Sequence, residues 1–210
     1  MKKISIFAAL LAVLCFFGAE AQKTKPTIAA VKKATTIDVA KSTVVWVGKK
    51  VTGEHTGNIS IKSGSLSVSG ASLVGGEVVI DMNTITCTDL KDAEYSGKLV
   101  GHLKADDFFG TEANPTSTLK ITSVKPIKGA KLGANNSTVG GTITIKGVSQ
   151  PVSFPAMVTV GKGGKLAAKG VITVDRTKFG VKYGSKSFFE GLGDKTIYDD
   201  FTLSFDVVSQ

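Results

Sequence analysis

Residues 138–145 read TVGGTITI, and their side chains alternate between two chemical classes. Successive side chains of a β-strand point to opposite faces of the sheet, so this alternation is typical of a half-buried antiparallel strand. One face of the sheet should therefore meet an apolar interior. The apolar or small face holds Val139, Gly141, Ile143 and Ile145, and the other holds Thr138, Gly140, Thr142 and Thr144.

The same two-residue period recurs along most of the chain from Thr35 onward. Breaks that contain glycine, typical of hairpins, interrupt it at Gly64, Gly75-Gly76, 129–133, Lys146-Gly147 and 161–164. We expect about eight antiparallel strands from this spacing. Further apolar faces are Val44, Trp46 and Gly48; Val78, Ile80 and Met82; Leu166, Ala168, Gly170, Ile172 and Val174; and Phe201, Leu203, Phe205 and Val207.

One segment, 88–109, departs from this period. It is polar and carries Leu90, Ala93, Tyr95 and Leu99 at loosely helical spacing, which predicts a short helical excursion. Antiparallel strands in this number form either two stacked sheets or a closed barrel. The sequence has three tyrosines and one tryptophan, too few for the aromatic girdles of a membrane barrel, so we expect an apolar interior.

The N-terminal residues 1–21 have the pattern of a secretory signal peptide. Lys2 and Lys3 precede an apolar run, and Ala19-Glu20-Ala21 supplies the small residues of a cleavage site before Gln22. We therefore expect an exported protein, periplasmic or secreted. Residues 22–34 are predicted to be a flexible lead-in to a single domain, 35–210. Cys87 would be the only cysteine after cleavage, which excludes an internal disulfide and favours a buried thiol.

The charge and the motifs exclude several classes of function. The formal net charge is +9, but the lysines are scattered and are not interleaved with aromatic residues, so we expect no nucleic-acid partner. An anionic membrane surface is a candidate partner. The sequence contains no G-x-S-x-G elbow, H-E-x-x-H motif, P-loop or dinucleotide fingerprint. We therefore expect no enzyme activity.

Two polar groups are candidates for chemistry. His102 and Asp106 are four residues apart and would share one face of a helix, with His55 as a distant third group for a metal or acid/base site. The alternative is a capping or hydrogen-bonding role for the pair. Arg176 is the only arginine of the sequence and follows a strand. It predicts either an ion pair at the barrel end or an anchor for a ligand head group.

Several motifs together resemble one known family. They are WVGK at 46–49, GEHTG at 53–57, HLKADDFF at 102–109, GTITIKGVSQPV at 141–152 and DRTKFGV at 175–181. In this order they are similar to the YceI-like, polyisoprenoid-binding family, over nearly the whole chain after the signal. Three features depart from the family pattern: Trp46 stands where phenylalanine is usual, Lys49-Lys50 where many members have a histidine, and Gly110 where an acidic residue is common.

The resemblance implies an eight-stranded antiparallel lipocalin-like β-barrel that holds a long apolar chain. It implies no cofactor beyond a bound lipid or isoprenoid, no metal and no catalytic residue. A homodimer is a further candidate assembly. Carried over by position, the candidate ligand-binding residues are Trp46, His55, His102, Phe108, Phe109, Arg176, Phe179 and Tyr183.

The leading hypothesis is an exported carrier that sequesters a long-chain amphiphile, a polyisoprenoid or fatty-acid derivative. Its tail would lie in the barrel and its head near Arg176 or a histidine. Two rival hypotheses stay open at this point. One is a metal-dependent or acid/base enzyme that uses His55, His102 and Asp106, and the other is a ligand-free structural or stress-related barrel.

Overall fold

The computed structural model describes residues 32–210, which form one antiparallel sheet of ten strands with a single α-helix. The predicted signal peptide, 1–21, and most of the predicted lead-in lie outside the described residues. The strands are β1 (Lys32–Thr36), β2 (Thr43–Lys50), β3 (Gly53–Asn58), β4 (Ser60–Ser69), β5 (Ser72–Asp81), β6 (Thr116–Pro126), β7 (Ser137–Ile145), β8 (Val148–Val160), β9 (Leu166–Asp175) and β10 (Ile197–Val208). The helices are α1 (Ala93–Lys104) and the 3-10 turns η1 (Met82–Thr84), η2 (Lys162–Gly164), η3 (Arg176–Phe179) and η4 (Gly193–Lys195).

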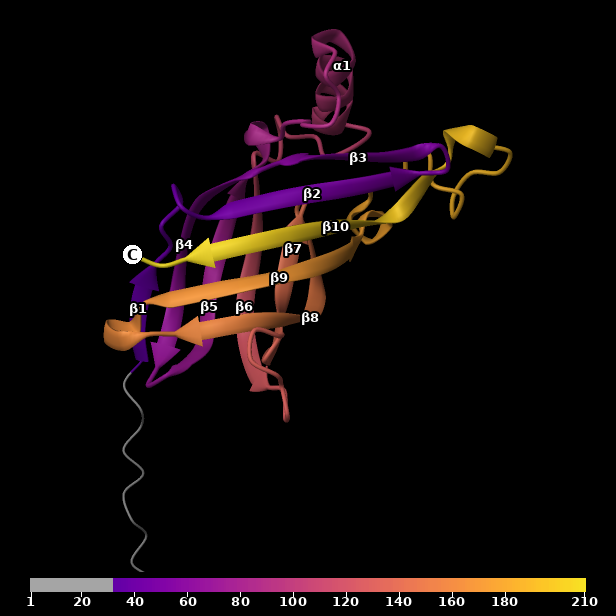
Figure 1. The fold of residues 1–210 in the computed structure, drawn as a ribbon. Coiled ribbons are helices and arrows are strands. Elements are labelled where there is room, and N and C mark those ends of the chain that lie inside the picture. The colour runs from indigo at the N-terminus through magenta and orange to yellow at the C-terminus, as the bar shows by residue number, and fades with distance from the viewer. Residues whose placement is uncertain (1–31) are drawn as a thin grey trace, which may run out of the picture.

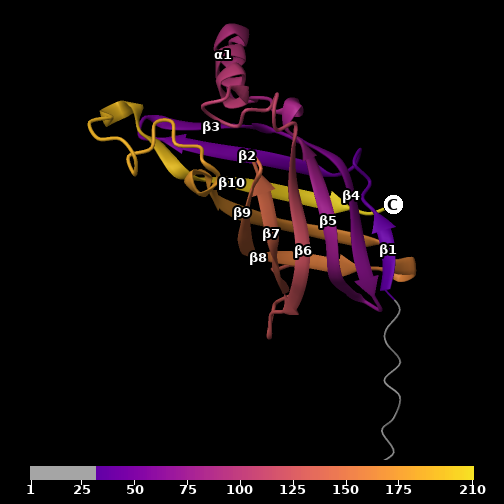
Figure 2. The same cartoon turned by 180° about the vertical axis from the view of Figure 1, so that it is seen from behind.

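The sheet curls into two facing walls. Its strand order is β1-β4-β5-β6-β7-β8-β9-β10-β2-β3. Strands β4 to β7 form one wall, and β8, β9, β10, β2 and β3 form the other (Figures 1 and 2). The expected all-β, antiparallel, lipocalin-like architecture is confirmed, and the apolar faces of the alternating strands meet between the walls.

The strand number is corrected from eight to ten. Strand β1 begins at Lys32, so residues 32–34 belong to the sheet and not to a lead-in. The predicted breaks at Gly64 and Gly75-Gly76 were wrong, because these residues lie inside β4 and β5. The real turn is 70–71, between the paired residues Ser69 and Ser72. The breaks at 129–133, Lys146-Gly147 and 161–164 do separate strands.

Ile37 closes the sheet at one end. Its amide donates to the carbonyl of Gly64, and the residue forms a bridge with Ser209 after the end of β10. Its side chain is 1% exposed. A Cβ atom on Gly64 would collide with Cδ1 of Ile37, so the glycine that resembled a break is instead the space into which Ile37 packs. The edge of β3 is covered separately, since Thr86 and Thr88 donate their amides to carbonyls of Asn58 and Thr56.

The helical excursion is confirmed as α1, which projects from the sheet (Figure 1). Asp92 caps its first turn by accepting hydrogen bonds from the amides of Glu94 and Tyr95. None of its residues is buried. No helix within residues 32–210 has the length and apolar character needed to span a bilayer.

Replacing Ile37 with alanine is expected to lower the free energy of unfolding by about 2–5 kcal/mol, because it empties a fully buried site. Gly64→Ala should also destabilise, but it should cost less in the Ile37→Ala background, where Cδ1 is absent. Urea unfolding of the two single variants and the double variant measures this coupling. The exposed Val39→Ala is the control and should change stability by less than about 0.5 kcal/mol. Equal costs of Gly64→Ala in both backgrounds would contradict the packing role of Ile37.

Candidate functional site

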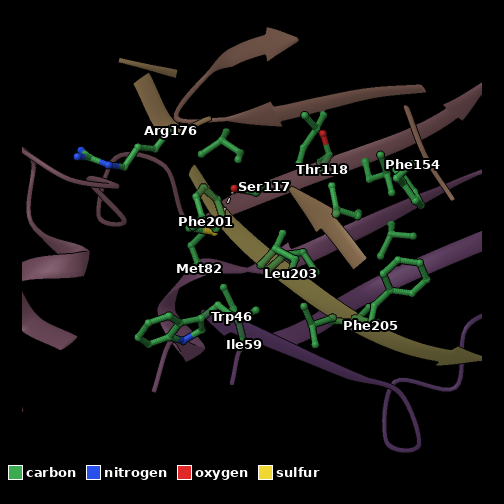
Figure 3. Close-up of a pocket in the computed structure, with 18 of the residues that line it drawn as sticks. Trp46, Ile59, Met82, Ser117, Thr118, Phe154, Arg176, Phe201, Leu203 and Phe205 are labelled. Atoms are coloured by element: carbon green, nitrogen blue, oxygen red, sulfur yellow. Dashed lines mark hydrogen bonds between the residues drawn. The ribbon is translucent and has the colours of Figure 1, made fainter. Parts of the chain in front are cut away.

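A cavity of about 190 Å³ lies between the two walls. Its lining is almost entirely apolar and runs from Phe154 and Phe205 to Trp46, Met82 and Phe201 (Figure 3). Most of the lining comes from the alternating apolar faces of the strands, including Val44, Val78, Ile80, Val139, Ile143, Ile172 and Leu203. A cavity walled by aliphatic and aromatic side chains stays dry and accepts apolar molecules.

The cavity opens at a bulge in β10. Ile197 pairs with Lys50 and Phe201 pairs with Gly48, so residues 198–200 lie opposite Lys49 alone. Such a bulge interrupts the ladder and bends the strand away from its neighbour. The lining residues that are exposed lie here: Lys49, Tyr198 and Asp200. We therefore place the mouth of the cavity between the end of β2 and the start of β10.

Arg176 holds this bulge in place. Its side chain is 2% exposed, and its guanidinium donates through Nε to the carbonyl of Tyr198 at 3.1 Å, through Nη2 to that of Ile197 at 3.1 Å and through Nη1 to that of Val181 at 3.0 Å. Figure 3 shows the guanidinium pointing away from the labelled apolar residues of the cavity. The arginine lines the cavity with its stem, while its charged head donates to carbonyls at the bulge and to that of Val181.

The charge of Arg176 is balanced by Asp199, whose Oδ1 lies 3.6 Å from Nη2. Burial lowers the pKa of Arg176, and the carboxylates of Asp199 and Asp175 oppose that shift. Burial alone would raise the pKa of Asp199. Hydrogen bonds from Ser185 and Ser187 and the charge of Arg176 outweigh burial, and the pKa is lowered. The pair is therefore ionised, which corresponds to the predicted ion pair at the barrel end.

Phe108 and Phe109 follow α1 and form part of the cavity wall. Their rings meet edge to face at 5.1 Å, and the guanidinium carbon of Arg176 lies 5.5 Å from the centre of the Phe108 ring. Lys146, in the turn between β7 and β8, donates to the carbonyl of Phe108 at 3.0 Å. The phenylalanine pair thus lines the cavity on one side, and Phe108 contacts the guanidinium of Arg176 on the other.

His102 and Asp106 do not share a helix face, because α1 ends at Lys104. His102 instead lies 3.5 Å from Asp107 through Nε2, and its ring packs edge to face on Tyr183 with centroids 4.4 Å apart. Neither ring lines the cavity. Phe179 is buried in the core but is also outside the lining.

Trp46 and His55 lie close to the segment that covers β3. Trp46 lines the cavity, and its Nε1 donates to the carbonyl of Thr86 at 2.9 Å. His55 Nδ1 lies 2.8 Å from Asp89 Oδ2, and the thiol of Cys87 donates to Asp89 Oδ1 at 3.2 Å. The Cys87 side chain is half-buried and hydrogen-bonded, whereas the sequence predicted a buried thiol.

Asp89 has a strongly perturbed pKa. Burial would raise it, but hydrogen bonds from the Thr56 amide, His55 and Cys87 prevail and lower the pKa to about 2. Among residues 32–210, no three His, Cys, Asp or Glu side chains are arranged to hold a metal ion. His55 and His102 each pair with a different carboxylate, Asp89 and Asp107. Asp89, bonded to His55, the Thr56 amide and Cys87, thus supports the edge of β3.

Four of the predicted site residues line the cavity: Trp46, Phe108, Phe109 and Arg176. His55, His102, Phe179 and Tyr183 do not. A role in ligand binding stays a prediction for all of them. Motif reasoning missed most of the lining, although the alternation of apolar residues had already marked many of those positions as inward-facing. It also missed the mouth, because a bulge leaves no clear signal in a run such as IYDDFTL at 197–203.

Arg176→Met is expected to lower the free energy of unfolding by about 3–5 kcal/mol, because it strips three backbone carbonyls of their donor and leaves Asp199 without its cation. Arg176→Lys should rescue only part of this loss, since an ammonium cannot reproduce the planar fork. Thermal or urea unfolding measures both. Lys178→Met, an exposed cation in the same turn, should change stability by less than about 1 kcal/mol. Wild-type stability for Arg176→Met would show that the bulge does not need the guanidinium.

The lowered pKa of Asp89 predicts a specific loss of stability in acid. Its pKa falls from 3.8 to about 2 on folding, so its contribution is complete above pH 3.8 and disappears as the pH falls toward 2. Unfolding free energies measured from about pH 5 to about pH 2 should therefore fall less steeply for Asp89→Asn than for the wild type. Glu112→Gln, on an exposed side chain, should follow the wild type. Parallel pH profiles for wild type and Asp89→Asn would contradict the role of this carboxylate.

Comparison with known proteins identifies the family. The model of the YceI-like domain matches residues 36–209. BcnA of Burkholderia cenocepacia shares the fold with a TM-score of 0.61 and 23% identity, over 83% of this chain and 99% of that one. A polyisoprenoid-binding domain from Saccharophagus degradans, implicated in plant cell wall breakdown, superposes with a TM-score of 0.59 and 16% identity, over 83% and 97% of the two chains.

A search of curated proteins found no match to this sequence. At these identities the two solved structures establish similarity of fold. The domain match covers every strand from β2 to β10 and includes Ile37, Arg176 and the residues that line the cavity. The chain belongs to the YceI-like family.

Proposed function

We propose that this protein is an exported binding or carrier protein that sequesters a long-chain amphiphile, a polyisoprenoid or a fatty-acid derivative. The apolar cavity between the two walls carries this proposal. Each methylene group that a ligand buries there contributes about 0.8 kcal/mol. A long hydrocarbon chain can therefore bind firmly with few polar contacts.

The polar groups of the lining favour one orientation of the ligand. Lys49, Tyr198 and Asp200 lie at the mouth, where a head group could remain in contact with water. Away from the mouth, the Ser117 hydroxyl donates to the sulfur of Met82 at 3.1 Å (Figure 3). This hydroxyl therefore does not need a polar atom of the ligand as a hydrogen-bond acceptor. The tail would occupy the interior and the head would lie beside Lys49 and Tyr198. Arg176 is a weaker candidate for the head-group contact, because backbone carbonyls occupy its donors.

The comparisons support this proposal. The Saccharophagus degradans domain with the same fold is described as polyisoprenoid-binding. Export is supported by the charged and apolar pattern of residues 1–21. The enzyme hypothesis has less support within residues 32–210, since His55 and His102 each pair with a separate carboxylate and Asp106 lies outside α1. The cavity also argues against a ligand-free barrel with a filled interior.

Organic extraction of the purified protein, followed by mass spectrometry, should recover a long-chain amphiphile. Leu203→Trp places an indole in the middle of the cavity wall and should reduce the recovered ligand at least about ten-fold, because the indole occupies the ligand's volume. The matched control is Val171→Trp, on an exposed position of the neighbouring strand β9, which should keep the wild-type amount.

Phe108→Ala is expected to lower stability, ligand retention or both, because this buried ring lines the cavity and packs against the guanidinium of Arg176. The proposal would be overturned by wild-type protein that yields no extractable or exchangeable amphiphile. Equal recovery from Leu203→Trp and the wild type would place the ligand outside the cavity.

A further inference from the structure

Four of the five exposed aromatic side chains within residues 32–210 lie near the mouth of the cavity. Elsewhere in residues 32–210, the exposed large apolar residues are Tyr95 on α1 and aliphatic residues such as Leu132 and Val171. Near the mouth lie Tyr183, Phe188, Phe189 and Tyr198, which we call the aromatic rim; Phe188 is 47% exposed and Phe189 is 50% exposed. Exposed phenylalanines are costly in water, so two adjacent ones indicate a surface that becomes covered.

The rim is attached to the bulge that forms the mouth. Tyr198 belongs to both, since it lines the cavity and is exposed. The segment 182–196 is joined to β10 by a hydrogen bond from the Ile197 amide to the Gly184 carbonyl at 2.8 Å and by one from the Ser187 hydroxyl to Asp199 at 2.6 Å. In Figure 1 this yellow segment projects at the end of the sheet where β2 turns into β3. The phenylalanines are therefore presented beside the opening.

The segment that carries these rings has an excess of basic residues. Residues 178–195 contain four lysines against two carboxylates. The ammonium of Lys182 lies 4.7 Å from the centre of the Phe188 ring, and Lys49 is exposed at the mouth itself. Aromatic rings that enter the boundary between head groups and acyl chains, combined with lysines that meet lipid phosphates, are typical of proteins that bind bilayer surfaces.

We propose that the aromatic rim docks this protein onto the surface of a bilayer that contains anionic phospholipids. Phe188 and Phe189 enter the interface, the lysines of 178–195 contact phosphates, and the mouth between Lys49 and Tyr198 faces the lipid. A long-chain amphiphile then moves between bilayer and cavity without crossing water. This transfer step rests on the proposed function, whereas docking itself requires no bound ligand.

Flotation with lipid vesicles tests the docking. The wild type should float with vesicles of phosphatidylcholine that contain about a quarter phosphatidylglycerol, and less with phosphatidylcholine alone. The double variant Phe188→Ala/Phe189→Ala should bind at least about ten-fold more weakly. The control is Leu132→Ala, which removes an even more exposed apolar side chain beside Lys131 in the loop between β6 and β7 and should bind like the wild type.

Either of two results overturns the proposal: no flotation of the wild type, or unchanged flotation of the double variant. A concentration-dependent dimer that the double variant abolishes, in protein that does not float, would assign the rim to a second copy of the chain and would also overturn it. Leu203→Trp separates this inference from the proposed function. If it floats like the wild type, docking stands whether or not the cavity carries an amphiphile.

Discussion

The end of the molecule that carries the β10 bulge depends on one buried guanidinium, that of Arg176. Arg176 donates to the carbonyls of Val181, Ile197 and Tyr198, which belong to segments that no regular ladder joins. Unpaired buried carbonyls are costly, so a bulge of this size requires a donor with several hydrogens in one plane. Arginine meets this requirement, and lysine does not. Arg176 thus ties the bulge at the mouth to Val181, at the start of the segment that carries the aromatic rim.

The opposite end uses apolar packing for closure. Ile37 bridges to the end of β10 and packs its side chain over Gly64 in β4. A fully buried isoleucine closes the sheet without any polar group that must be satisfied. The two ends therefore differ in chemistry: one is sealed by apolar contact, and the other is kept open by a bulge whose carbonyls are bound. The exposed lining residues, Lys49, Tyr198 and Asp200, lie at the end that carries the bulge.

The sequence predicts the sheet well and the site only in part. Alternation in stretches such as TVGGTITI depends on local geometry, because a strand exposes each side chain to one face or the other. It correctly marked Val139, Ile143 and Leu203 as inward-facing. The function of Gly64 depends on Ile37, which is distant in sequence, so a local reading mistook the glycine for a turn. The pairing of His102 with Asp106 on one helix face was wrong, because α1 ends at Lys104 before it reaches Asp106.

The chemistry of the cavity indicates what it can discriminate. Within residues 32–210, the buried side-chain nitrogen and oxygen atoms without a hydrogen-bond partner are Asp199 Oδ1 and Asp206 Oδ1, and neither residue lines the cavity. The polar atoms of Trp46, Ser117 and Arg176 already have partners in the protein. A ligand that carries polar groups along its chain would bury them unpaired, at a cost of about 1–3 kcal/mol each. Selection should therefore depend on the length and cross-section of an apolar chain, and head groups should be distinguished only at the mouth.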